Sequence, residues 1–204
     1  MDYLKPADMP AVLERTKLKA NEENFLLPIY EAVSNAIYSA QNRWGIDVSA
    51  KGQVSVTITT GSFQAVIADN GVGLDEVNYG HFLTPFTGFR LKRGGKGFGR
   101  FIAFKVFDDI AYASRFDSEK REQERAFSFN IYDEPQITDE LISKPSLNFD
   151  KGCVVRYREP KEEFAKIGSA LSGEDIVERT IRLFPVSDHE TDRPNCLRRI
   201  SGTS

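Results

Sequence analysis

Apolar residues recur with helical spacing between positions 25 and 43. The residues on the predicted buried stripe lie three or four positions apart and are Phe25, Ile29, Val33, Ala36 and Ala40. This spacing is typical of an amphipathic helix that packs one face on a core. Pro28 falls in the first turn, where proline is tolerated, and Gly45 follows the last turn. The pattern predicts a helix over residues 25–43.

Strict alternation of apolar and polar residues marks the first predicted strand. In residues 53–60, valine and isoleucine alternate with serine and threonine, as in a half-buried strand. Gly61 and Ser62 separate this segment from residues 63–68, so the two predict a β-hairpin.

The rest of the pattern completes one domain with a sheet and a helical layer. Further strands are predicted at 110–116, 125–132 and 152–158, and further helices at 76–82, 97–107 and 172–184. Residues 133–149 are polar and contain prolines, and predict a long connection. The elements predict an α+β fold with helices on one face of the sheet.

Composition narrows the functional classes only a little. The chain has 204 residues, 28% of them charged, and a formal net charge of −3, so no global basic character points to nucleic acid. Cys153 and Cys196 are the only cysteines, too few for a disulfide framework. No segment approaches the roughly eighteen apolar residues of a membrane span. The sequence predicts a cytoplasmic protein with no membrane partner.

Candidate chemistry begins on the polar side of the predicted helix 25–43. Glu31 and Asn35 are four residues apart and therefore lie one above the other, and Tyr38 and Asn42 continue this polar row. The row is either a solvated helix face or one wall of a site.

A second candidate follows the predicted strand 63–68. Asp69 stands at its end and is followed by Gly71 and Gly73. This arrangement fixes a carboxylate on a rigid element and lets backbone approach a ligand closely. The alternative is an ordinary Asp-Asn-Gly turn.

A third candidate is rich in glycine and positive charge. Residues 94–99 contain four glycines, and five basic residues fall within residues 90–100. The apolar run that follows predicts a helix, whose free N–H groups and positive dipole end suit a polyphosphate. The alternative is a basic surface loop. Residues 83–95 have no periodicity and predict a mobile lid.

The three candidates, in this order, resemble the motifs of the GHKL ATPase superfamily, which contains gyrase, heat-shock chaperones, histidine kinases and MutL. The matching segments are Glu31–Ala36, Asp69–Gly73, Gly95–Arg100 and, in part, Gly152–Val155. The resemblance covers roughly residues 22–184 and is closest to stand-alone bacterial chaperone-, MORC- or MutL-like ATP-binding domains. It implies a Bergerat-type two-layer α/β sandwich, with a mixed, mainly antiparallel sheet and a mobile lid. Residues 1–21 are then a lead-in, and residues 185–204 a polar tail that could begin a further domain.

The resemblance also implies roles for single residues, with ATP and Mg²⁺ as cofactors. Asp69 would accept the adenine amine, Asn35 would bind Mg²⁺, and Glu31 would be the general base for water. Gly71 and Gly73 would let backbone pass close to the nucleotide. The residues expected near the phosphates are Lys96, Gly97, Phe98, Gly99 and Arg100.

Two residues depart from the superfamily pattern. Cys153 stands where threonine usually bridges the adenine-binding carboxylate and a water, and a thiol is a weaker donor. Tyr38 stands where many relatives carry an acid.

The expected activity is ATP binding with slow hydrolysis, because related proteins complete the site with a basic residue from a following domain. Nucleotide state would gate a conformational change or a homodimer formed on lid closure, with a protein or nucleic-acid client. Two alternatives stay open at this stage: a histidine-kinase-like phosphotransfer domain and a non-hydrolysing nucleotide-sensing module.

Overall fold

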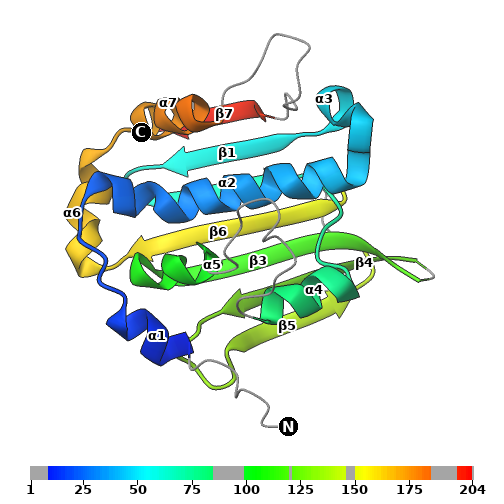
Figure 1. The fold of residues 1–204 in the computed structure, drawn as a ribbon, viewed down its shortest axis with the longest axis horizontal. Coiled ribbons are helices and arrows are strands. Elements are labelled where there is room, and N and C mark those ends of the chain that lie inside the picture. Colours follow the sequence, from blue (N-terminus) through cyan, green and yellow to red (C-terminus); the bar gives the residue numbers. More distant parts are fainter. Residues whose placement is uncertain (1–8, 85–98, 120, 146–149, 185–196, 204) are drawn as a thin grey trace, which may run out of the picture.

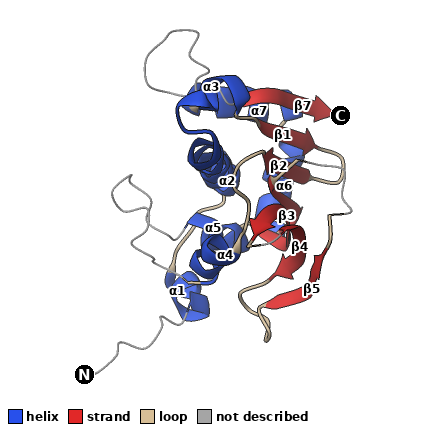
Figure 2. Ribbon diagram, turned by 90° about the vertical axis from the view of Figure 1, so that its right-hand side faces the viewer, coloured by secondary structure: helices blue, strands red, loops and turns tan. Residues whose placement is uncertain are grey.

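The computed structural model describes residues 9–84, 99–119, 121–145, 150–184 and 197–203. Helices and strands fall into two layers (Figures 1 and 2). The helices are α1 (Met9–Arg15), α2 (Glu22–Trp44), α3 (Val48–Lys51), α4 (Glu76–Leu83), α5 (Gly99–Ile102), α6 (Glu162–Ala170) and α7 (Gly173–Leu183). The strands are β1 (Val54–Thr59), β2 (Gln64–Asp69), β3 (Phe107–Ser118), β4 (Arg121–Phe129), β5 (Ile137–Ser143), β6 (Gly152–Pro160) and β7 (Leu197–Thr203).

The strands form one sheet in the order β5-β4-β3-β6-β2-β1-β7. Every neighbouring pair is antiparallel except β1 and β7, which run parallel. The predicted α+β class and the mainly antiparallel sheet are therefore confirmed. The predicted hairpin is also confirmed, with Val54 opposite Asp69 and Thr59 opposite Gln64.

Helix α2 is the main element of the helical layer and lies along the sheet (Figure 1). Its N-cap Asn21 accepts a hydrogen bond from the backbone N–H of Asn24, which satisfies one of the free donors at the helix start. The apolar stripe predicted for this helix is buried as expected. At its first turn Phe25 meets Phe63, Phe107 and Phe164, with ring centroids 4.9, 5.7 and 6.3 Å away. These rings join α2 and α6 to the sheet, since aromatic pairs at such distances attract beyond simple burial.

Several elements differ from the prediction. The segment predicted as the long connection 133–149 contains β5, an edge strand whose side chains are mostly exposed and so lack apolar alternation. Helix α6 was not predicted, and β7 lies within the range predicted as a polar tail but belongs to this sheet. The predicted helix 97–107 is confined to α5 and a 3₁₀ turn at Ala103–Lys105, because Phe107 already pairs with Pro160 as the first residue of β3.

The predicted lid falls mainly on residues 85–98, which lie outside the described residues. No helix among the described residues has the length and apolar character needed to cross a membrane.

Candidate functional site

A polar row on α2 faces the sheet. Glu31, Asn35 and Ser39 follow one another at intervals of four residues, so each stands one turn from the next. All three are half-buried. The row is therefore partly covered by protein, and the reading of Glu31 and Asn35 as a fully solvated face does not hold.

The two ends of this row meet two different parts of the sheet. The Ser39 hydroxyl donates to the Asp69 carboxylate at the end of β2. Burial raises the pKa of Tyr157 on β6 well above its usual range, and the nearby charge of Glu31 adds to the effect. The row thus runs along the sheet from Tyr157 to Asp69, antiparallel to β6 (Figure 1). One helical turn and two strand residues each advance about 6 Å, so the spacing of residues along the row matches the spacing of every second residue along β6.

Asp69 is a buried carboxylate held by three donors. Its Oδ1 accepts the Gly71 N–H at 2.7 Å, and the Ser39 hydroxyl and the Cys153 N–H also donate to it. Burial raises the pKa of Asp69 to about 7, although these hydrogen bonds and the charge of Arg43 lower it. The carboxyl is therefore fixed in position and close to half-ionised at neutral pH.

Sequence reasoning missed the residues that hold the turn after Asp69. The side chain of Asn70 accepts from the Gln53 N–H and donates to the Lys51 carbonyl, both at 2.8 Å. From the end of α2, Arg43 and the Trp44 indole donate to the Asn70 carbonyl at 2.8 and 3.2 Å. These contacts fix the turn to the helix. The only sequence signal was an asparagine after a strand, which is common in any turn.

The two glycines after Asp69 pack against protein backbone. A Cβ on Gly71 would lie 2.1 Å from Ser39 Oγ and 2.6 Å from the Ala40 nitrogen of α2. Gly73 has a φ of +74°, and a Cβ there would lie 2.5 Å from the Arg115 carbonyl oxygen. Both positions therefore need glycine for the fold itself, whatever else they allow.

Cys153 lies directly beside Asp69. Its N–H donates to that carboxylate, and burial together with the charge of Asp69 raises the pKa of its thiol well above the usual range. The thiol therefore stays protonated and is a weak donor toward the site. The preceding Gly152, with φ of +149°, is the reason for this close approach, since a Cβ there would lie 1.9 Å from the Asp69 carbonyl oxygen.

A buried tyrosine pair lies at the other end of the row. Tyr112 and Tyr157 are 9% and 2% exposed, and their hydroxyls are hydrogen-bonded to each other. Burial, and then the nearby Cys153, raise the pKa of Tyr112, while the charge of Arg100 lowers it. Sequence reasoning singled out neither tyrosine, because it did not establish that strands 110–116 and 152–158 are neighbours in the sheet.

The glycine-rich stretch is described only from Gly99 onward. Lys96, Gly97 and Phe98 lie outside the described residues. Gly99 begins α5, which packs against α2. The Arg100 guanidinium donates to the Thr84 carbonyl at 2.9 Å and lies 5.4 Å from the Phe82 ring centroid. Arg100 therefore links the start of α5 to the C-terminal end of α4.

The described residues thus place Asp69 and Cys153 beside Ser39 of α2, Glu31 near Tyr157, and the start of α5 beside α2. Asn35 lies between Glu31 and Ser39 on the helix. The region has the fixed carboxylate of Asp69 at the Ser39 end of the row. One and two helical turns earlier it has the Asn35 amide and the Glu31 carboxylate, which could hold water or a cation. Neither protein-family models nor curated proteins match this chain.

Proposed function

We propose that this chain binds Mg-ATP between α2 and the helix-facing side of the sheet and hydrolyses it slowly. The observation that carries the proposal is the single polar row on α2. Its Ser39 end holds Asp69, while its Glu31 end lies near the buried tyrosine pair. ATP would lie along the whole row, with its adenine at Asp69 and its phosphates toward Asn35 and Glu31.

The adenine end depends on a positioned hydrogen-bond acceptor. Asp69 is oriented by Gly71, Ser39 and Cys153, so it needs little reorganisation to accept an exocyclic amine. The guanine carbonyl at the same position would face a carboxylate and be repelled, which gives adenine selectivity. Because the pKa of Asp69 is about 7, affinity for adenine should rise as the pH rises through neutrality.

The phosphate end depends on Asn35, Glu31 and the start of α5. Mg²⁺ prefers oxygen ligands and keeps several waters, so the Asn35 amide oxygen and nucleotide phosphates form a reasonable shell. Across the described residues, no group of three or more His, Cys, Asp or Glu gathers to hold a metal ion. When bound, the ion would offset phosphate charge. Backbone N–H groups from Gly99 onward would meet phosphate oxygens.

Hydrolysis would use Glu31 as the general base. A water attacks the γ-phosphorus, its proton passes to the Glu31 carboxylate, and the bond to the β-phosphate oxygen breaks to give ADP and phosphate. Nucleotide state would then gate a conformational change or dimerisation that acts on a protein or nucleic-acid client.

Calorimetric titration tests the binding step. We expect ATP with Mg²⁺ to bind and GTP to bind at least ten-fold more weakly, and Asp69→Asn to abolish this difference. Equal binding of ATP and GTP by the wild-type chain would contradict the proposal.

A Glu31→Gln variant separates hydrolysis from binding. We expect it to keep ATP affinity within about three-fold while slowing phosphate release by at least a hundred-fold, because only the base is lost. Glu163→Gln, an exposed glutamate on α6, is the matched control. Unchanged phosphate release in Glu31→Gln would favour a nucleotide-sensing module. Labelled phosphate retained on a protein histidine would favour phosphotransfer.

A further inference from the structure

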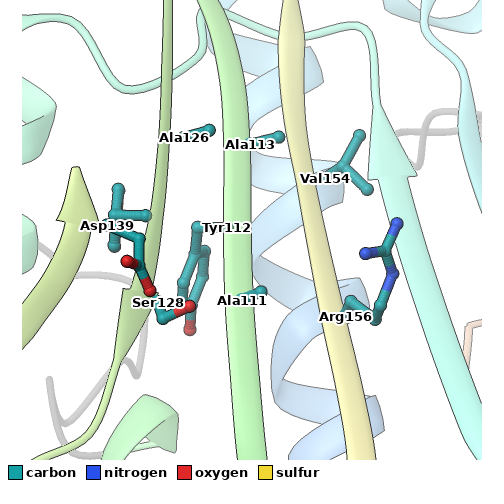
Figure 3. A pocket seen from close by; sticks show the side chains of 9 residues that line it. Ala111, Tyr112, Ala113, Ala126, Ser128, Asp139, Val154 and Arg156 are labelled. Carbon is teal, nitrogen blue, oxygen red and sulfur yellow. The ribbon is translucent and has the colours of Figure 1, made fainter. Parts of the chain in front are cut away.

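The face of the sheet that points away from α2 carries a cluster of small side chains. Across β4, β3 and β6, Ala126 lies opposite Ala113, and Ala113 lies opposite Val154. In the next row Ser128 lies opposite Ala111. We call Ala111, Ala113, Ala126 and Ser128 the alanine floor; it forms the base of a shallow pocket of about 240 Å³ (Figure 3). Alanine is depleted in strands, so this run on an open face needs a cause beyond strand propensity.

Two opposite charges stand on the two sides of the alanine floor. Asp139 on β5 and Arg156 on β6 both line the pocket and are exposed (Figure 3). Within the described part of the chain neither takes part in an ion pair. Three strand spacings, about 14 Å, separate β5 from β6. The floor therefore has a negative charge on its β5 side, Asp139, and a positive charge on its β6 side, Arg156.

This pattern is complementary to itself under one particular rotation. A two-fold axis that lies between two facing sheets, along the strands and between β3 and β4, exchanges the β5 side with the β6 side. Each Arg156 then faces Asp139 of the second copy, and the pair occurs twice by symmetry. An axis across the strands would instead set Arg156 against Arg156. Charge complementarity thus selects both the occupant and its orientation.

The apolar residues fit the same rotation. Leu141 on β5, 62% exposed, lies opposite Ala126 at one end of the row that continues through Ala113 to Val154. The rotation sets Leu141 near Val154 of the second copy and one alanine floor against the other. Two such faces would pack as aligned sheets, and small side chains at the centre allow the close approach.

We propose that this sheet face is the interface of a homodimer formed by two copies of the chain. The interface lies on the opposite side of the sheet from the nucleotide region, so the dimer needs no nucleotide. This distinguishes it from a dimer formed on nucleotide binding, and the proposal does not rest on the proposed function.

Sedimentation velocity of charge-reversal variants, measured without nucleotide, tests the proposed homodimer. We expect wild type to dimerise reversibly at concentrations up to about 100 µM, the range of a modest interface. Arg156→Asp and Asp139→Arg should each weaken association at least ten-fold, and the double variant should recover to within about three-fold of wild type. Asp139 has a φ of +55°, which arginine tolerates poorly, so Asp139→Asn serves as a second variant and should weaken association several-fold.

Two controls separate this interface from other causes. Arg182→Asp reverses an exposed charge on α7 and should leave association unchanged. Asp69→Asn should also dimerise as wild type does, whether or not it binds nucleotide. A monomeric wild type at all concentrations, or a dimer that both single reversals leave intact, would overturn the proposal.

Discussion

At the scale of single residues, Asp69 is a carboxylate whose charge is opposed by its surroundings. Burial raises its pKa to about 7 from an ordinary value of 3.8, in spite of three hydrogen bonds that favour the ionised form. Such a carboxyl is fixed in place yet lacks full solvation, and this combination is common where a protein must bind a ligand.

This pKa predicts how stability depends on pH. Between about pH 4 and pH 7 the folded chain holds a proton on Asp69 that the unfolded chain lacks, so the free energy of unfolding falls as the pH rises. The upper bound for this loss is about 4 kcal/mol. Urea unfolding of wild type and Asp69→Asn across this range checks it, since the variant lacks this group. Parallel pH profiles for the two proteins would contradict the raised pKa.

The close packing of Gly71 against α2 predicts that a larger residue at this position destabilises the fold. Gly71→Ala places a Cβ 2.1 Å from Ser39 Oγ and 2.3 Å from the Ser39 carbonyl carbon, so α2 or the turn must shift. We expect a loss of about 3 kcal/mol or more in the free energy of unfolding.

Gly61→Ala is the matched control for this change. A Cβ at Gly61 meets nothing within 4 Å, and we expect an effect within about 1 kcal/mol. Similar melting temperatures for the two variants would show that Gly71 is not packed against α2.

The candidate site could be predicted from sequence only where local spacing carries the information. Helical spacing placed Glu31 and Asn35 on one face, and the end of the predicted strand 63–68 placed Asp69 at a strand terminus. The Asn70 contacts to Arg43 and Trp44 were not predictable, because they join segments that are far apart in sequence. The hydrogen bond between the tyrosines depends on neighbouring strands and was missed for the same reason.

At the scale of elements, a buried arginine fixes α4 to the sheet. Arg125 on β4 has a side chain that is 2% exposed and forms ion pairs with Glu76 of α4 at 3.0 Å and Glu140 of β5 at 3.5 Å. Its guanidinium lies 3.7 Å from the Tyr79 ring centroid and donates to the Leu74 carbonyl. Burial, and then a hydrogen bond to Glu140, raise the pKa of Tyr79 to about 12, so this tyrosine remains neutral.

Removing this arginine should release α4. Arg125→Ala removes a buried side chain together with its contact to the Tyr79 ring and its ion pairs to Glu76 and Glu140, and we expect a loss of about 1–3 kcal/mol in the free energy of unfolding. Hydrogen exchange in residues 76–83 should accelerate, while exchange in α2 follows only the global change. Arg121→Ala, an exposed arginine on the same strand, should change neither quantity. If hydrogen exchange in α4 is the same in Arg125→Ala as in wild type, Arg125 does not anchor this helix.

Periodicity predicted the elements that have one buried face and missed the others. Helix α2 and the hairpin of β1 and β2 bury a regular apolar stripe, and their sequence shows it. Strand β5 lies at the sheet edge and exposes most of its side chains, so hydrogen bonding to β4 rather than burial makes it a strand. Helix α5 is shorter than its apolar sequence predicts. The apolar run resembles a helix that continues to residue 107, but Phe107 already pairs with β6 as part of β3.

At the scale of the whole molecule, the two faces of one sheet have different roles in this account. The face toward α2 carries Asp69, Cys153 and the tyrosine pair, and we propose that it binds nucleotide. The opposite face carries the alanine floor with Asp139 and Arg156, and we propose that it joins two copies. Both assignments predict that ligand binding and self-association can be disrupted independently.

The central claim is that Mg-nucleotide lies between α2 and the helix-facing side of β2 and β6. Hydrogen exchange measured with and without Mg-ADP, in wild type and in Asp69→Asn, tests it most directly. We predict slower exchange in residues 31–39, 69–74 and 152–157 of wild type, no such change in Asp69→Asn, and no change in α7 of either protein. Slower exchange elsewhere with these three segments unchanged, or equal protection in Asp69→Asn, would contradict the account.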